Sequence, residues 1–97
     1  MTTYIIFVNW TDQGIKNVRE SPGRLDAAKK LLADMGGNFQ QFYLTMGDYD
    51  MVAVCEAPDD AVMARMVLKL GQGGYIRTRT LKAFPENAYR EIINSLG

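Results

Sequence analysis

The pair Gly47-Asp48 constrains this fold more than any other feature, because it separates two β-rich runs at residues 38–46 and 49–56. Glycine adopts the positive φ angles of the tight turns that join neighbouring antiparallel strands. Two β-rich runs on either side of such a pair predict a β-hairpin with a two-residue turn. The turn also fixes which residues of the two strands lie opposite each other.

In the predicted register Leu44 lies opposite Met51, and Phe42 lies opposite Ala53. Opposed side chains share one face of the sheet. One face is then almost wholly apolar and is expected to lie beneath helices: Phe42, Leu44, Met46, Tyr49, Met51, Ala53 and Cys55. The other face is mixed: Phe39, Gln41, Tyr43, Thr45, Asp50, Val52, Val54 and Glu56. A bulge at the turn would exchange the two faces.

The remaining segments alternate between strand and helix patterns. Residues 4–10 and 75–84 predict two further strands. A helix capped by Ser21 is expected to bury one face, made of Leu25, Ala28, Leu32 and Met35. A second helix begins near Asp59-Asp60 and carries an apolar stripe of Val62, Met63, Met66, Val67 and Leu70. After Pro85, a short amphipathic helix is predicted from Tyr89, Ile92, Ile93 and Leu96.

The order β-α-β-β-α-β predicts an α+β fold of the ferredoxin-like type, as one domain over residues 1–97 with an extra C-terminal helix. Right-handed crossovers place both long helices on one side of the antiparallel sheet. The opposite face then lies open and carries Phe39, Tyr43, Val52 and Val54. Such an apolar patch is rare on a monomer, so we expect a homodimer or higher oligomer that pairs through this face.

Composition excludes several classes of function. Eleven basic residues balance 11 acidic ones, which leaves no basic surface for nucleic acid. The chain has no histidine, so the commonest general base and the usual zinc or haem ligand are missing, and we expect no metal and no cofactor. No apolar run is long enough for a membrane span. The single cysteine, Cys55, suits a reducing cytoplasm and is expected to be buried and inert.

The string Gly-Asp-Tyr-Asp at residues 47–50, followed by Met-Val-Ala-Val-Cys-Glu-Ala-Pro-Asp, resembles the signature of GYD domain proteins. Residues 10–17, 21–24 and 77–85 are similar to the same family. The resemblance runs from about Tyr4 to Pro85. It implies a ferredoxin-like fold of the dimeric α+β barrel type, and it implies little about activity because the family is one of uncharacterised function.

Tyr49 and Asp50 are the candidate catalytic residues, as a hydrogen-bond donor and an acid or base at the mouth of a pocket. A structural interpretation competes with this one. Tyr49 would then cover an apolar face, and Asp50 would bond to turn amides or to Thr45 across the strands.

Trp10, Tyr43, Tyr49, Asp50 and Arg77 form the candidate ligand-binding set. Arg77 is suited to hold an anion, although such arginines more often face solvent or an interface. A place in the core is the simpler interpretation of Trp10. The pocket itself is expected between the sheet and the first long helix, where the Ser21-Pro22 break disturbs helix packing.

These observations lead to one leading function and two alternatives. The leading hypothesis is a homo-oligomeric domain that binds a small molecule between sheet and helices. The runner-up is a cofactor-independent isomerase or oxygenase of the dimeric α+β barrel type, and the sequence leaves open whether the protein is an enzyme. The third is a purely structural module that assembles through sheets and terminal helices.

Overall fold

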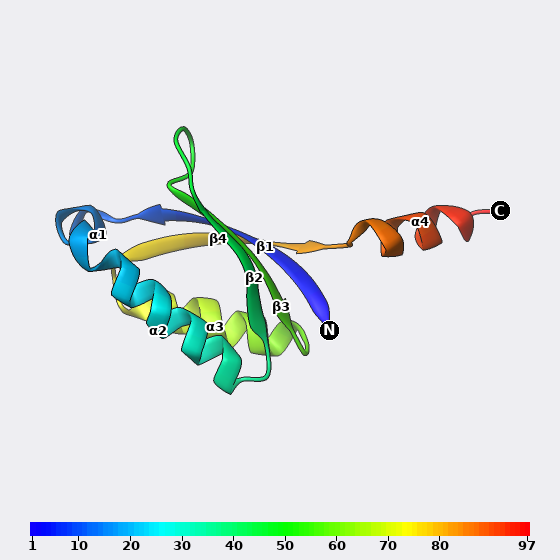
Figure 1. Ribbon diagram of the computed structural model, residues 1–97, viewed down its shortest axis with the longest axis horizontal. Helices are drawn as coiled ribbons and strands as arrows, with labels where there is room; N and C mark the ends of the chain where they lie inside the picture. Colours follow the sequence, from blue (N-terminus) through cyan, green and yellow to red (C-terminus); the bar gives the residue numbers. More distant parts are fainter.

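The computed structural model covers residues 1–97 and forms two layers, with a pair of helices on one face of a sheet (Figure 1). Its strands are β1 (Thr2–Trp10), β2 (Asn38–Leu44), β3 (Met51–Ala57) and β4 (Ile76–Ala83). They are antiparallel in the order β2-β3-β1-β4. The helices are α1 (Asp12–Lys16), α2 (Ser21–Asp34), α3 (Asp60–Gln72) and α4 (Glu86–Asn94), with a 3-10 turn, η1 (Val18–Glu20). This arrangement confirms the ferredoxin-like α+β fold.

The core lies between the sheet and the two long helices, α2 and α3. Side chains alternate along β1 and β3, so that every second one points toward the helices and is buried. The buried cluster is Tyr4, Ile6, Val8, Leu32, Met51, Ala53, Cys55, Ala57, Val62, Met63 and Met66. Cys55 is buried, as predicted, and burial raises the pKa of its thiol to about 12, which disfavours the reactive thiolate. None of the helices is long and apolar enough to cross a membrane.

The hairpin differs from the prediction at its turn. Strands β2 and β3 keep the predicted register from Gln41 to Leu44, but they end before the turn, and residues 45–50 form a loop. Gly47 does adopt a positive φ of 120°. Because the strand ends at Leu44, neither Leu44 nor Met46 reaches the core, and they are 69% and 99% exposed. Tyr49 turns to the face away from the helices, where its ring stacks on Phe7.

Phe39 lies on the helix side of the sheet, whereas the predicted register places it on the opposite face. The register of β2 against β3 shifts between Phe39 and Gln41. An extra residue in one strand reverses the face of every side chain on one side of the bulge. Phe39 therefore packs against the core with Phe42.

Thr11 and Gly14 determine how the first helix, α1, begins after β1. The Thr11 hydroxyl accepts from the Gly14 amide at 3.1 Å and donates to the Gly74 carbonyl at 2.6 Å. A Cβ atom at Gly14 would lie 1.9 Å from the Tyr75 carbonyl oxygen, so only glycine permits this approach. Ser21 is not the N-cap of α2 as predicted: Glu20 occupies that position, without a side-chain capping bond.

Candidate functional site

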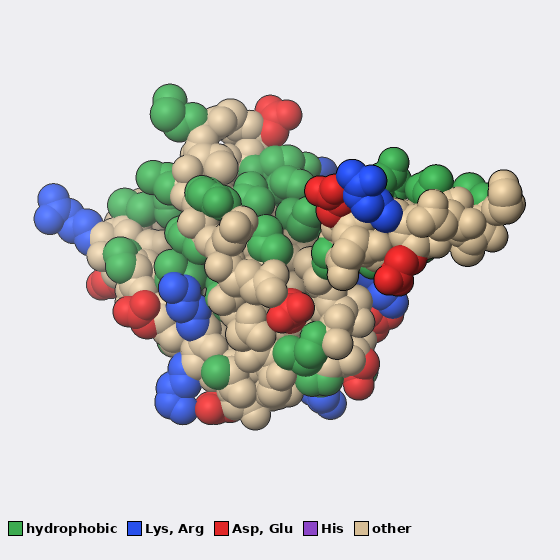
Figure 2. Space-filling model, turned by 45° about the vertical axis from the view of Figure 1, so that its right-hand side comes forward, with side chains coloured by type: hydrophobic (Ala, Val, Ile, Leu, Met, Phe, Trp, Pro, Cys, Tyr) green, Lys and Arg blue, Asp and Glu red, His purple; other side chains and the backbone are tan.

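The sheet face opposite the helices is open and largely apolar. Pairing places Ile5 beside Val54 and Leu81, and Phe7 beside Val52 and Arg79. We call this surface the open face and define its apolar part as Ile5, Phe7, Tyr43, Tyr49, Val52, Val54 and Leu81. Figure 2 shows apolar side chains gathered over this side of the molecule. No helix covers it (Figure 1).

The Gly-Asp-Tyr-Asp loop is tied to the end of β1 by Asp50. The Asp50 carboxylate accepts the Trp10 backbone N–H at 2.9 Å. The backbone N–H of Asp50 donates to the Val8 carbonyl at 3.0 Å and to Asn9 Oδ1 at 3.1 Å. Thr45 closes the loop, because its N–H donates to the Asp50 carbonyl at 2.8 Å. These bonds give Asp50 a structural task, which is to satisfy the last backbone donor of a central strand.

Tyr49 lies on the open face, against Phe7. Its ring centroid is 4.6 Å from that of Phe7, with the planes inclined by 33°. Aromatic pairs at this separation stabilise a sheet surface by roughly 0.5–1.5 kcal/mol beyond their area. The ring of Tyr49 therefore extends the apolar part of the open face over the end of β1.

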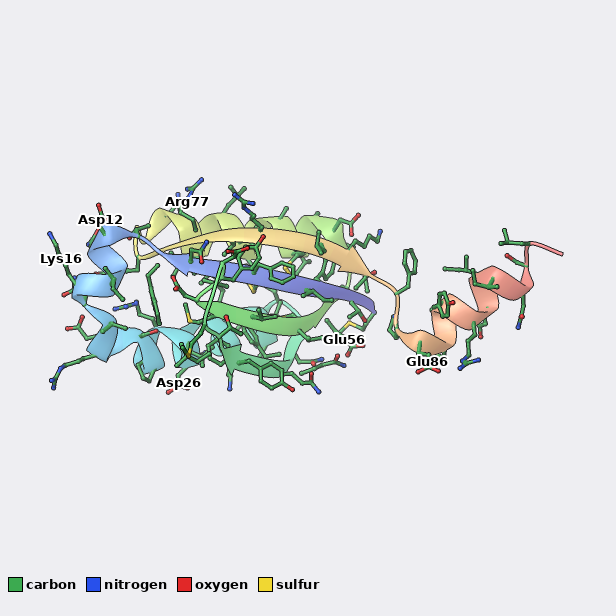
Figure 3. The ribbon with its side chains drawn as sticks, turned by 90° about the horizontal axis from the view of Figure 1, so that it is seen from above. Asp12, Lys16, Asp26, Glu56, Arg77 and Glu86 are labelled. Atoms are coloured by element: carbon green, nitrogen blue, oxygen red, sulfur yellow. The ribbon has the colours of Figure 1, made fainter.

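The remaining candidates lie apart from one another. Tyr43 is 53% exposed at the outer edge of the open face. Arg77 lies on the same face at the start of β4, where Asn9 is its partner in β1, and Figure 3 looks onto this side. Trp10 packs against the core, and its indole N–H is buried without an acceptor. The structure brings Trp10 and Asp50 together and leaves Tyr43 and Arg77 on the open face.

A separate cavity lies between the sheet and α2, where the sequence predicts a pocket. Its volume is about 100 Å³, and 12 of its 15 lining residues are hydrophobic, among them Ile6, Val8, Leu25, Ala28, Phe42 and Ile76. None of the five candidate ligand-binding residues lines it. The polar residues of its wall are Ser21, Arg24 and Thr78.

Arg24 lies over Tyr75 in the wall of this cavity, and neither residue is among the site residues predicted from the sequence. The Arg24 guanidinium lies 4.2 Å from the centre of the Tyr75 ring. It also donates to the Asn17 carbonyl at 3.1 Å and lies 3.7 Å from Glu20. The Ser-Pro-Gly-Arg segment at residues 21–24 was the available indication, since it places an arginine in the first turn of a helix.

Comparison with known proteins decides the family. The family model described as GYD domain matches residues 4–93. This chain belongs to the GYD domain family. The match extends past Pro85 into α4, beyond the segments whose residues resemble the family signature.

The GYD domain has relatives among characterised and solved proteins. A Thermus thermophilus protein named glutamine synthetase and cystathionine beta-lyase binding protein is 36% identical over 86 residues, which is 88% of this chain and 90% of the relative. A crystal structure of a protein from the same species, Thermus thermophilus, has a TM-score of 0.54 at 24% identity over 88% of this chain and 95% of its own. The Mycobacterium tuberculosis leucine response regulatory protein has a TM-score of 0.56 at 13% identity, over 87% of this chain and 51% of its own. The two structural matches show the fold alone.

At the other end of the GYD domain sheet, Tyr4, Asp60 and Lys82 form a small polar cluster. The Tyr4 hydroxyl donates to one oxygen of Asp60, and Lys82 lies 3.2 Å from the other. Burial, and then the bond to Asp60, raises the pKa of Tyr4 to about 12. The bonds from Tyr4 and Lys82 lower the pKa of Asp60. No group of three or more His, Cys, Asp or Glu side chains is placed to hold a metal ion.

The raised pKa of Tyr4 predicts a loss of stability at alkaline pH. The folded chain holds the Tyr4 proton up to about pH 12, and the unfolded chain releases it near 10.0. The stabilisation is therefore complete below pH 10 and disappears as the pH rises toward 12. Urea unfolding at a series of pH values should show wild type losing stability relative to Tyr4→Phe across this range. Parallel curves for the two proteins would contradict the prediction.

Proposed function

We propose that this GYD domain is a self-associating protein-binding module that pairs through its open face and docks onto other proteins. The observation that supports the pairing most strongly is the continuous apolar surface across the sheet. Its members come from all four strands and the hairpin loop. At its edges Tyr43 and Leu81 are 53% and 52% exposed. Contiguous apolar surfaces of this kind mark protein interfaces.

The proposed partner of the dimer follows from the name of a relative. The relative that is 36% identical is named as a binding protein for glutamine synthetase and cystathionine beta-lyase. This chain aligns with 90% of that relative, so the surfaces available to both are similar in extent. We therefore propose a metabolic enzyme of this kind as the partner of the dimer.

Titration against purified enzymes tests the partner. Fluorescently labelled protein is mixed with glutamine synthetase, and separately with cystathionine beta-lyase, from the same organism. Saturable binding with a dissociation constant of roughly 10 µM or less is expected for at least one of them. An unrelated enzyme of similar charge is the control. Equal, unsaturable signals from all three enzymes at about 100 µM would contradict the proposal.

A second candidate function, small-molecule binding, is favoured by the cavity beneath α2. Its volume of about 100 Å³ and its hydrophobic walls suit a group the size of one aromatic ring. Arg24 at its polar side is 26% exposed and has donors for an anion. We propose that any such ligand is a small apolar acid. No contact of Tyr49 or Asp50 favours the isomerase or oxygenase alternative.

Benzoate is a suitable probe for this cavity. Thermal unfolding should show the melting temperature rising with benzoate concentration, because a ligand that binds only the folded state stabilises it. Filling the cavity with Ala28→Leu should abolish the shift, because the new side chain occupies the volume lined by Ala28. Arg24→Gln should abolish it for benzoate and preserve it for benzyl alcohol. Equal shifts in wild type and Ala28→Leu would place the benzoate site elsewhere.

A further inference from the structure

Helix α4 carries an apolar stripe that nothing in its own chain covers. Tyr89, Ile92, Ile93 and Leu96 are 55%, 42%, 48% and 75% exposed, and no residue of the helix is buried. A nine-residue helix is marginal in water unless its apolar face packs against something. Figure 1 shows α4 projecting beyond the end of the sheet, away from both long helices. The chain accordingly measures 53 × 31 × 17 Å.

The link to β4 keeps α4 away from its own sheet. Only Phe84 and Pro85 separate the last residue of β4 from the first of α4. Pro85 is extended, with φ −57° and ψ 161°, and its ring fixes φ near this value. The helix therefore continues outward from the end of β4 and does not fold back over the open face.

The stripe lies on the same side of the molecule as the open face. Leu81 belongs to that face as the partner of Ile5, and Phe84 lines a shallow groove together with Ile5 and Val54. Figure 2 shows the apolar side chains of α4 on the same side of the molecule as those of the sheet. The apolar part of the open face, Phe84 and the stripe of α4 therefore lie on one side of the molecule.

The chain exposes more surface than a compact monomer of its mass. Its accessible surface is 6599 Å², whereas a compact monomer of this mass exposes about 5,600 Å². The excess of about 1,000 Å² counts polar and apolar surface together, and it is large enough to include the roughly 800 Å² that each partner contributes to a standard interface. The polar side of α4 carries Glu86, Arg90 and Glu91, which does not suit an anionic membrane because helices on such surfaces are rich in Lys and Arg.

We propose that α4 is an exchanged arm, which packs its apolar stripe against a second copy of this chain and extends the interface between the open faces. This inference rests on the proposed self-association. A two-fold dimer uses the same surface on both copies, so each copy gives one arm and receives one. The arm thereby gains the packing that its short helix lacks, and the second copy covers Phe84, which is 62% exposed.

Sedimentation equilibrium of full-length variants tests the arm. Ile92→Glu combined with Ile93→Glu places two charges in the stripe and should raise the dimer dissociation constant about 100-fold or more. Asn87→Glu combined with Asn94→Glu adds the same charges to the polar side of the same helix and should change it less than about threefold. Equal dissociation constants for the two variants would overturn the inference, and the stripe would then serve another protein.

Hydrogen exchange of residues 89–96 separates an exchanged arm from one that folds onto its own chain. These amides should be protected in the dimer and should exchange rapidly in a variant whose open face no longer pairs, because an isolated short helix frays. Equal protection in dimer and monomer would overturn the exchange. A wild-type chain that never dimerises would end the self-association proposal as well, whereas a dimer indifferent to the stripe charges would end this inference alone.

Discussion

A glutamate at Val54 should turn the dimer into a monomer. Val54 lies in the middle of the open face, between Ile5 of β1 and Gln41 of β2. In a two-fold dimer the substitution introduces two like charges into a largely apolar interface, where burying and repelling charges both cost free energy. We expect the dissociation constant to rise about 1,000-fold or more, which corresponds to about 4 kcal/mol. Sedimentation velocity over a concentration series measures the change.

Leu68→Glu is the matched control for this experiment. Leu68 is 70% exposed on α3, in the layer that covers the other side of the sheet. The Leu68→Glu substitution replaces an aliphatic side chain by the same charge, far from the open face, and should leave the dimer intact. Circular dichroism of both variants checks that the fold persists. A Val54→Glu protein that dimerises as tightly as Leu68→Glu would rule out pairing through the open face.

Asp50→Ala should destabilise the fold by about 2 kcal/mol. The substitution leaves the Trp10 backbone N–H, which the carboxylate accepts at 2.9 Å, without its acceptor at the end of a central strand. An unsatisfied backbone donor of this kind costs roughly 1–3 kcal/mol. Asp50→Asn retains a side-chain oxygen and should lose less than half as much. Urea denaturation measures both losses.

Asp48→Ala serves as the control, because Asp48 is exposed in the same loop. Its effect should stay within about 0.5 kcal/mol. If Asp50→Ala were as stable as Asp48→Ala, the hydrogen bond from the Trp10 N–H would not be the reason for an aspartate at position 50 of the Gly-Asp-Tyr-Asp signature. If Asp50→Asn kept its stability and lost only binding of a ligand, a chemical role for the carboxylate would be supported instead.

The sequence predicted the overall fold well because its elements are regular. Alternation along β1 and β3 and the apolar stripes of α2 and α3 decide which face of each element is buried. Those patterns are local, so periodicity alone reveals them. The resemblance to the GYD family implies the same fold independently. The family match confirms the family, and the strand order confirms the fold.

The errors lie where a local pattern competes with contacts distant in sequence. No pattern in residues 38–42 predicts the bulge that moves Phe39 to the core. At the turn, residues 45–50 form an open loop in place of a two-residue turn, and the Asp50 carboxylate of this loop accepts from the distant Trp10 N–H. Tyr49 follows this loop onto Phe7, so its predicted face was wrong. Strand alternation cannot anticipate bonds between segments that lie 40 residues apart.

Contacts between residues distant in sequence also limit what could be predicted about the cavity. Its position between the sheet and α2 was predicted from the Ser21-Pro22 break, and the structure places a cavity there. Arg24 in its wall lies over the ring of Tyr75, a contact between the first turn of a helix and the residue before the last strand. Motifs on separate elements do not reveal which of their side chains meet.

Sedimentation velocity of the unmodified chain tests the central claim most directly. The protein is studied from about 1 µM to about 500 µM at neutral pH. Pairing through the open face predicts a species of twice 10.9 kDa that dominates at the upper concentrations. A single species of 10.9 kDa across the whole range would contradict it.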